Sequence, residues 1–246
     1  MLTKHTASAL ALSAAAALML TACGGGGDDN PSPDPGPGPT PPADILPAEI
    51  DFDAREEWLR PGATVPLQLE LEDARDRDVS DPVAANVQVG IISDDTGGAT
   101  LSAQQLSTVR GKANFSITLG SGLGTVIVQA TTDRADNNIA NGITDELSWL
   151  LGMVVTPLGD GLNWELPAVV DVRAGGSARL EDADDGARGR RSYSVNGAGG
   201  FTLAECGDDV CLTAPAGTAA GSYNLNFTVT DTAGSTLTMP VTVAVH

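Results

Sequence analysis

Residues 221–246, GSYNLNFTVTDTAGSTLTMPVTVAVH, indicate most clearly how this chain folds. Apolar side chains occupy every second position over 223–229 and again over 237–245, with polar residues between them. A period of two is typical of a β-strand with one buried face. The Asp-Thr-Ala-Gly sequence at 231–234 supplies a turn between the two runs. The sequence therefore predicts an antiparallel hairpin at this end of the chain.

The same alternation recurs upstream and extends the prediction to the rest of the chain. Aromatic residues are few, and no long helical pattern occurs. Short strands at regular spacing, with Gly- and Asp-rich turns between them, are typical of β-sandwiches. We therefore predict an all-β protein with two tandem sandwich domains, at 44–156 and 157–246. The expected strands are 65–71, 87–91, 113–119, 126–130, 147–155, 166–172, 178–180, 193–195, 201–203 and 210–212.

Two local expectations concern the beginning of the first domain. Pro66 has no backbone N–H to donate, so its strand should lie at a sheet edge or begin there. Phe52, Trp58 and Leu59 belong to the lead-in before the first expected strand, and we expect them to plug the end of the domain.

One stretch of the first domain resembles a known family. Its pattern is Gly111-Lys112-Ala113-x-Phe115-x-Ile117, then Gly120, Gly124 and Val126-x-Val128-x-Ala130. This is similar to the late hairpin of invasin- and intimin-type bacterial immunoglobulin-like domains. The chain departs from that family in having Thr108-Val109-Arg110 where a Thr-Asp turn is usual. The resemblance implies an immunoglobulin-like sandwich used as a spacer or surface module.

The end of the second domain carries a similar signal. Pro215-x-Gly217-x-x-x-Gly221-x-Tyr223 is followed by Val229-Thr230-Asp231-x-Ala233-Gly234. The pattern is similar to the closing hairpin of bacterial immunoglobulin-like and cadherin-like repeats. It implies that Tyr223 is the corner tyrosine that such sandwiches often contain.

The first 22 residues have the three parts of a secretory signal peptide. Lys4 supplies the positive region, and 9–20 is an apolar run too short for the ~20 residues of a spanning helix. Leu20-Thr21-Ala22-Cys23 then resembles the lipobox of bacterial lipoproteins. The resemblance implies cleavage before Cys23 and lipid on its sulfur, which would anchor the chain in a membrane. The family's sorting rule, with Gly24 rather than aspartate after the cysteine, implies the outer membrane. The alternative is an ordinary signal peptide with an incidental cysteine.

The segment from Gly24 to Pro42 contains no hydrophobic side chain. It cannot bury apolar area to offset chain entropy, so we expect 23–43 to be the lipidated cysteine and a disordered linker. Alternating prolines favour an extended chain of about 3.1 Å per residue. A proline-rich ligand for an aromatic groove of a partner is the alternative interpretation.

Charge restricts the class of partner. The chain has 13 basic and 32 acidic residues, for a formal net charge of −19. Removal of Lys4 with the signal makes the charge −20 and leaves Lys112 as the only lysine. Such a chain is repelled by nucleic-acid phosphates, so we expect no nucleic-acid partner.

Two further cysteines, Cys206 and Cys211, are five positions apart. In an oxidising compartment this spacing favours a local disulfide, worth about 2 kcal/mol in the loop-entropy model. The alternative, a redox or metal pair, lacks the Cys-x-x-Cys spacing and a nearby histidine.

The sequence offers little for catalysis. Its two histidines are His5, in the signal, and His246, at the last position, so neither domain contains an internal Ser-His, Cys-His or His-metal arrangement. We therefore expect that the protein is not an enzyme. The rival class is a carboxylate-dependent hydrolase, which needs two carboxyls flanking a cleft.

Calcium is the one cofactor considered, and the expectation is that none is required. Candidate ligands are Asp73, Asp76, Asp78 and Asp81 in one acidic loop and Glu181, Asp182, Asp184 and Asp185 in another. Neither loop has the complete alternating aspartate pattern, and acidic turns are commonly only solvated.

The combined prediction is a non-catalytic, lipid-anchored envelope protein. Its sandwiches would act as a surface spacer, adhesion or assembly module, with protein or glycan partners at exposed loops. The alternative is a periplasmic accessory lipoprotein that binds a glycan or a protein. The sequence leaves open which side of the outer membrane the domains face, the partner and the oligomeric state.

Overall fold

The computed structural model describes residues 45–54, 58–159, 161–183 and 189–246. The predicted signal peptide, Cys23 and the linker lie outside the described residues. The chain divides into two units, Met1–Pro42 and Ala43–His246. Within the described residues the regular elements are strands, which confirms the all-β prediction, and no helix there is long and apolar enough to cross a membrane.

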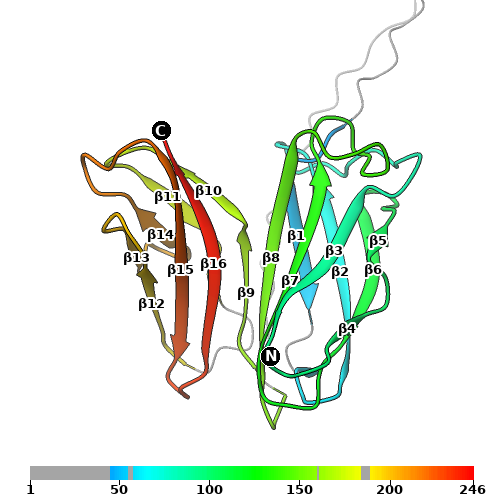
Figure 1. Cartoon of the computed structure of the whole chain (residues 1–246), viewed down its shortest axis with the longest axis horizontal. Coiled ribbons are helices and arrows are strands. Elements are labelled where there is room, and N and C mark those ends of the chain that lie inside the picture. Colours follow the sequence, from blue (N-terminus) through cyan, green and yellow to red (C-terminus); the bar gives the residue numbers. More distant parts are fainter. Residues whose placement is uncertain (1–44, 55–57, 160, 184–188) are drawn as a thin grey trace, which may run out of the picture. The chain divides into compact units, whose positions relative to one another are not determined.

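The first sandwich consists of two facing sheets (Figure 1). One has the strand order β1-β2-β6-β4 and the other β5-β3-β7-β8-β9. These orders correspond to the ABED and CFG sheets of an immunoglobulin domain, with β3, β7 and β8 in the places of C, F and G. The strands are β1 Glu49–Ala54, β2 Thr64–Glu72, β3 Val87–Asp94, β4 Thr100–Leu101, β5 Gln105–Leu106, β6 Lys112–Thr118, β7 Gly124–Asp133, β8 Glu146–Val155 and β9 Asn163–Pro167.

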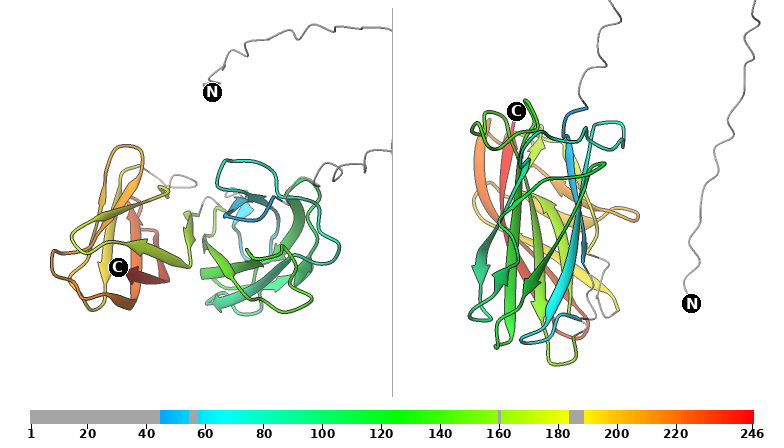
Figure 2. Two further views of the ribbon diagram at one scale, coloured as in Figure 1. Left: turned by 90° about the horizontal axis from the view of Figure 1, so that it is seen from above. Right: turned by 90° about the vertical axis from the view of Figure 1, so that its right-hand side faces the viewer.

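The second sandwich has the sheets β10-β16-β15-β12 and β11-β14-β13. Strand β10 runs parallel to β16, whereas the other pairs are antiparallel. With β11, β14 and β13 in the places of B, E and D, this sandwich is also immunoglobulin-like. The left view of Figure 2 shows each sandwich as a pair of layers. The strands are β10 Val169–Val172, β11 Ser177–Leu180, β12 Arg191–Asn196, β13 Thr202–Glu205, β14 Val210–Thr213, β15 Gly221–Asp231 and β16 Thr236–Val245.

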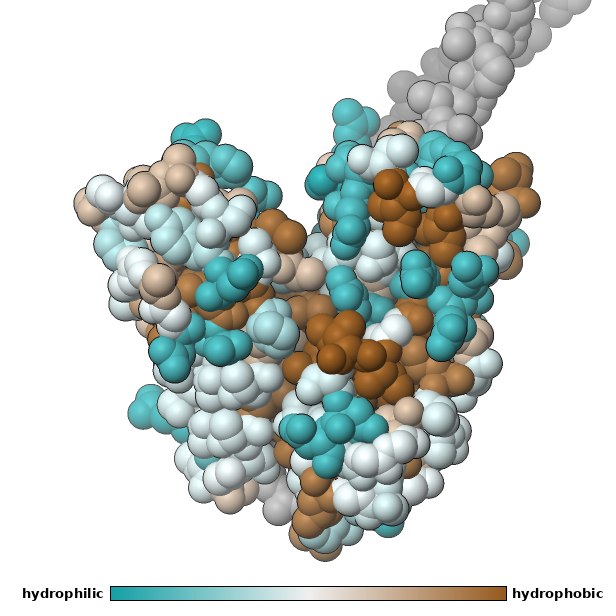
Figure 3. All heavy atoms as spheres, in the orientation of Figure 1, coloured by the Kyte–Doolittle hydropathy of each residue, from teal (hydrophilic) through white to brown (hydrophobic). Residues whose placement is uncertain are grey.

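Strand β8 is buried on both faces. Leu151 and Met153 belong to the core of the first sandwich, whereas Leu150 and Val154 belong to the core of the second. Because successive side chains point to opposite faces, β8 is an unbroken apolar run rather than an alternating one. On the face in view, apolar side chains gather over β7 and β8 (Figure 3). Strand β9, which follows the predicted boundary at 156/157, pairs with β8 and so extends the first sandwich's sheet.

Glycines permit two close approaches beside β8. A Cβ at Gly152 would lie 2.8 Å from the Met239 Sδ and 2.9 Å from a Leu237 methyl carbon, so this glycine admits β16. A Cβ at Gly161 would lie 1.6 Å from the Val154 carbonyl oxygen, which is less than any permitted contact. The turn from β8 into β9 therefore requires glycine at 161.

The C-terminal hairpin is confirmed. Strands β15 and β16 pair from Gly221↔Val245 to Thr230↔Thr236. The Tyr223 hydroxyl donates to the Ala219 carbonyl oxygen at 2.9 Å, which is the bond expected of a corner tyrosine. The aspartates at the ends of β7 and β15 have equivalent roles, because Asp133 and Asp231 each accept backbone N–H groups from the turn that follows.

Three local predictions were wrong. The 113–130 stretch is not a hairpin, because β6 pairs with β2 and β4 while β7 pairs with β3 and β8. Pro66 lies in an internal strand, since β2 pairs with β1 and with β6. In the described part of the pairing with β1 the last partners are Ala54 and Leu67, so the described β1 ladder does not include Pro66. Trp58 does not close the end of the domain, because the residue is 42% exposed, whereas Phe52 and Leu59 are buried as expected.

The disulfide between Cys206 and Cys211 is present. It closes the connection between β13 and β14, where Ala204 and Cys211 are partners in the ladder and the Cys206 N–H donates to the Asp209 carbonyl oxygen at 2.9 Å. The bridge therefore reinforces a hairpin that is already hydrogen-bonded.

Replacing both cysteines, Cys206→Ala with Cys211→Ala, should lower the free energy of unfolding by about 2 kcal/mol. The measurement is urea unfolding of the full chain with and without reductant. The double variant should be insensitive to reductant, and a wild-type chain that is equally insensitive would contradict the role of the bridge.

Gly161→Ala should destabilise the fold by about 2 kcal/mol or more, since the added methyl group meets a carbonyl oxygen on an ordered strand. Gly90→Ala is the matched control, because nothing lies within 4 Å of a Cβ there. Thermal unfolding should separate the two, and equal melting temperatures would refute this account of the β8–β9 turn.

Candidate functional site

The outer face of the β1-β2-β6 sheet carries a row of polar side chains. Asp53 of β1 lies opposite Gln68 of β2, which lies opposite Asn114 of β6. The Gln68 Nε2 donates to the Asn114 Oδ1 at 2.9 Å. The alternation of these strands turns their apolar neighbours inward, so the three polar groups share one face.

Trp58 stands at the end of this row. The described part of β1 ends at Ala54, and the chain is described again from Trp58, in the segment 58–63 that precedes β2. The backbone of this segment is fixed: the Leu59 N–H donates to the Gly159 carbonyl oxygen at 3.1 Å, and the Thr156 N–H donates to the Leu59 carbonyl oxygen at 2.9 Å. The tryptophan is therefore exposed on an ordered backbone.

These residues border an open hollow of about 380 Å³, here called the Trp58 groove. The described lining residues are Asp53, Trp58, Pro66, Leu67, Gln68, Asn114 and Phe115. Among them Asp53 is the only charged one. The same tryptophan also borders a second hollow of about 300 Å³, with Arg60, Ala63 and Thr64. Sequence reasoning missed this site because it assigned Trp58 to the core.

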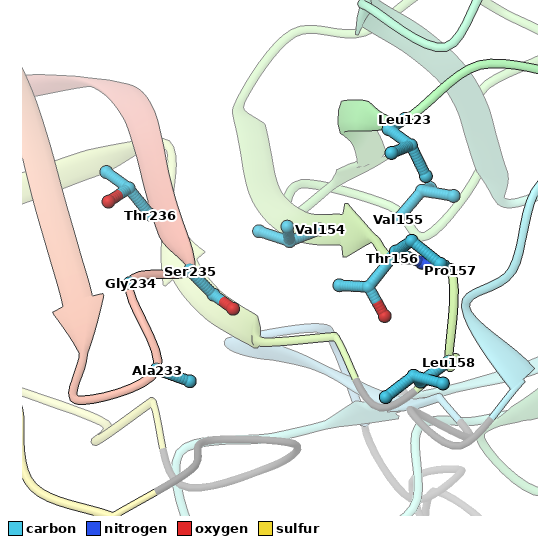
Figure 4. A pocket seen from close by; sticks show the side chains of 10 residues that line it. All are labelled: Leu123, Val154, Val155, Thr156, Pro157, Leu158, Ala233, Gly234, Ser235 and Thr236. Carbon is cyan, nitrogen blue, oxygen red and sulfur yellow. The ribbon is translucent and has the colours of Figure 1, made fainter.

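A further hollow of about 460 Å³ lies beside the loop that follows β8 (Figure 4). It combines Val154, Thr156 and Leu158 with the turn between β15 and β16, at Ala233 and Ser235. Its lining is mainly apolar or backbone, and no titratable side chain is among its described lining residues. This hollow therefore has no described acid, base or charged group that could act on a ligand.

Three carboxyl groups meet elsewhere in the fold. Within the described ranges, Asp51, Glu165 and Glu181 form a group of acidic side chains whose oxygens lie within 4.8 Å of one another. They come from β1, from β9 and from the segment after β11. No local spacing joins them, and only Glu181 was among the acidic residues singled out from the sequence, so the cluster was not predicted. Calcium takes six to eight oxygen ligands, and three carboxyl groups reach six only if each binds through both of its oxygens.

The surroundings of Glu165 favour a proton there. Burial raises the pKa of the Glu165 carboxyl to about 9, and the neighbouring Asp51 and Glu181 charges act in the same direction. The Phe52 N–H, which donates to the Glu165 Oε2 at 2.8 Å, opposes the shift. The Asp51 pKa is also raised, chiefly by burial. Glu165 is therefore the carboxyl of this cluster that most readily holds a proton.

The first predicted calcium loop uses its carboxylates internally. The Asp73 Oδ1 accepts the N–H groups of Arg75 and Arg77, and its Oδ2 accepts the Arg77 guanidinium. The Arg77 hydrogen bonds hold the Asp73 pKa below its usual value. Asp76 has a left-handed backbone, with φ of 56°. Asp78 forms a bridge with Glu72, and the Asp81 Oδ1 accepts the Arg110 N–H at 2.5 Å.

The second predicted loop is described only in part, because Asp184 and Asp185 lie outside the described residues. Asp182 pairs with the Arg191 guanidinium at 2.5 Å and accepts the Tyr193 hydroxyl. Burial, together with the hydrogen bond to Asp182, raises the pKa of the Tyr193 hydroxyl above its ordinary value. The Trp164 Nε1 donates to the Glu181 carbonyl oxygen at 2.9 Å, which ties this segment to the core. The expectation that no calcium is required stays a prediction, and the structure brings neither loop's described candidates into a common group of three.

Comparisons with known proteins found distant similarity to solved structures only. No protein-family model matches the sequence, and no curated protein matches it. Among solved structures, the chain is similar to the C-terminal 282-residue fragment of intimin in complex with the translocated intimin receptor (Tir) intimin-binding domain, at 11% identity and a TM-score of 0.28. It is also similar to the Escherichia coli adhesin FdeC, at 14% and 0.29, and to the D0-D1 domain of intimin, at 14% and 0.30.

The matches cover 79%, 80% and 78% of this chain. They cover 63% of the intimin fragment, 64% of FdeC and 94% of the D0-D1 structure. The first two matched structures are therefore longer than the region they share with this chain.

Glu165→Gln should flatten the pH dependence of stability. Because the folded-state pKa is raised to about 9, the folded chain holds a proton that the unfolded chain releases above about pH 4.5. Wild-type stability should be full below that pH and fall towards pH 9, by up to about 1.4 kcal/mol per pH unit.

The measurement is urea unfolding of the full chain at several pH values from about 4 to about 9, which span the pKa of Glu165 in the unfolded and in the folded chain. Glu205→Gln, on an exposed carboxyl of β13, is the control and should leave the wild-type slope unchanged. A Glu165→Gln slope equal to that of wild type would contradict the protonated cluster.

Proposed function

We propose that this protein is a non-catalytic binding module of the bacterial cell envelope, held by lipid on Cys23 and serving in adhesion or assembly. The observation that supports this most is the Trp58 groove. The groove presents an exposed tryptophan next to a hydrogen-bonded backbone, beside a row of amide and carboxyl groups on paired strands. A site that needs little ordering on association loses less affinity to entropy.

The arrangement of carboxyl groups supports binding over hydrolysis. A glycosidase places two carboxyls on either side of the scissile bond. The Trp58 groove has one among its described lining residues, Asp53. The carboxyls that do come together are those of Asp51, Glu165 and Glu181, and the Phe52 N–H donates to Glu165 among them. The His246 Nε2 lies 2.7 Å from the Asp171 Oδ1, on another part of the fold.

The alternative role is a periplasmic accessory lipoprotein that uses the same groove for a glycan or a protein. Both roles require the lipid and the groove, and they differ only in the side of the outer membrane on which the domains lie. Protease treatment of intact cells separates them. Digestion of the domains on intact cells supports surface exposure, whereas digestion only after the outer membrane is opened supports the periplasmic role.

Cys23→Ala should move the protein from the membrane pellet to the soluble fraction. The reason is that each buried methylene of a lipid chain contributes about 0.8 kcal/mol to membrane affinity, all of which is lost with the sulfur. The measurement is fractionation of cell envelopes followed by immunodetection. Unchanged fractionation would contradict the anchor, and Cys206→Ala with Cys211→Ala is the matched control that should stay in the pellet.

A further inference from the structure

We propose that the Trp58 groove binds a neutral oligosaccharide. The inference deepens the proposed function by assigning a ligand class to its binding surface. It stands on the exposed indole of Trp58, the polar row of Asp53, Gln68 and Asn114, and the charge of the groove.

The indole supplies the apolar contact. One face of a pyranose ring presents C–H groups, which pack against the electron-rich face of an aromatic ring. Trp58 is 42% exposed, whereas Trp164 is only 1% exposed and belongs to the core. The neighbouring Leu59 is fully buried and hydrogen-bonded through its backbone. The backbone next to the indole is thus held in place.

The polar row supplies hydroxyl recognition. The Gln68 Nε2 donates one of its two N–H groups to the Asn114 Oδ1. Within the described part of the chain, the Asn114 amide nitrogen and the Gln68 amide oxygen make no other bond, and Asp53 is exposed beside them. Together these groups offer both donors and acceptors, which is what the hydroxyls of a sugar require. Three adjacent strands spread them over about 10 Å, enough for more than one ring.

The second hollow at Trp58 lengthens the surface. Its other described residues are Arg60, Ala63 and Thr64, so the indole borders hollows of about 380 Å³ and about 300 Å³. The Arg60 Nε is engaged by the Leu158 carbonyl oxygen at 3.0 Å. A chain of sugar units could therefore run past the indole with contacts on both sides of it.

Charge decides which sugars fit. The single charged residue among the described lining of the Trp58 groove, Asp53, is acidic, whereas Arg60 in the second hollow is basic. The adjacent row pairs the Glu70 carboxylate with Lys112 at 2.7 Å, so the described surface has no excess of positive charge to attract an anionic sugar. The chain as a whole carries −19. Uronic acids, sulfated sugars and phosphates would be repelled. A neutral glycan avoids that cost.

The test is affinity electrophoresis of the full chain, purified in detergent, through native gels containing one soluble polysaccharide each. Hydroxyethylcellulose, arabinoxylan, galactomannan and dextran are the neutral probes, and polygalacturonate is the acidic one. At least one neutral probe should retard the wild-type chain, and polygalacturonate should not. Trp58→Ala should weaken the apparent affinity by about tenfold or more, because the stacking contact is lost. Trp58→Phe should retain part of it.

Gln68→Ala and Gln88→Ala form a matched pair on opposite sheets, since Gln88 is exposed on β3. The first should reduce retardation and the second should not. Binding should also change the tryptophan emission of the wild-type chain but not that of Trp58→Phe. Circular dichroism checks that each variant is folded.

The inference is overturned if none of the four neutral probes retards the chain, if only polygalacturonate does, if Trp58→Ala binds as the wild type does, or if the two glutamine variants behave alike. Its failure is separable from that of the proposed function. A chain that needs Cys23 for membrane association but ignores the neutral probes would remove the ligand class alone. A chain that binds them but fractionates without regard to Cys23 would remove the anchor alone.

Discussion

Burial of β8 on both of its faces is the constraint on which the rest of this structure depends. Leu151 points into one core and Leu150 into the other, so the strand belongs to both sandwiches at once. Each fully buried side chain of this size contributes ~1.5–3 kcal/mol relative to exposure. Parting the two cores would therefore expose one face of β8 to water. The pairing of β9 with β8 and the close approach of β16 at Gly152 follow from this requirement.

The same strand fixes the Trp58 groove. The segment around Leu59 is hydrogen-bonded to Thr156 and Gly159, which continue the chain directly from β8. The indole is thus positioned by the connection between the sandwiches rather than by the sheet it faces. The buried strand β8 and the loop that follows it thus hold the backbone next to the exposed Trp58.

The sequence predicts what depends on local periodicity and fails where distant strands meet. Alternation at 223–229 and 237–245 was enough to predict the last hairpin, and the position of Tyr223 was enough to predict its bond to the backbone at Ala219. Alternation does not say which strands pair, so the strands at 113–130 were assigned to one hairpin although they lie in different sheets. The carboxyl cluster could not be predicted for the same reason, because Asp51 and Glu165 are far apart in the sequence and come together only in the folded chain.

The acidic composition has a structural explanation that leaves the polar face available. Asp94 accepts the N–H groups of Thr96, Gly97, Gly98 and Ala99, and these bonds with the Thr96 hydroxyl lower its pKa to about 2. Asp133 is used in the same way. Turns thus absorb carboxylates because they present unpaired N–H donors. On the outer face of β1, β2 and β6 the donors are already paired in the ladder, so amides and hydroxyls such as Gln68 and Thr64 remain directed outward. The β1 and β2 strands also carry the acidic residues Glu49, Asp51, Asp53, Glu70 and Glu72. The sheet therefore combines neutral polar groups with negative charge, which repels anionic partners.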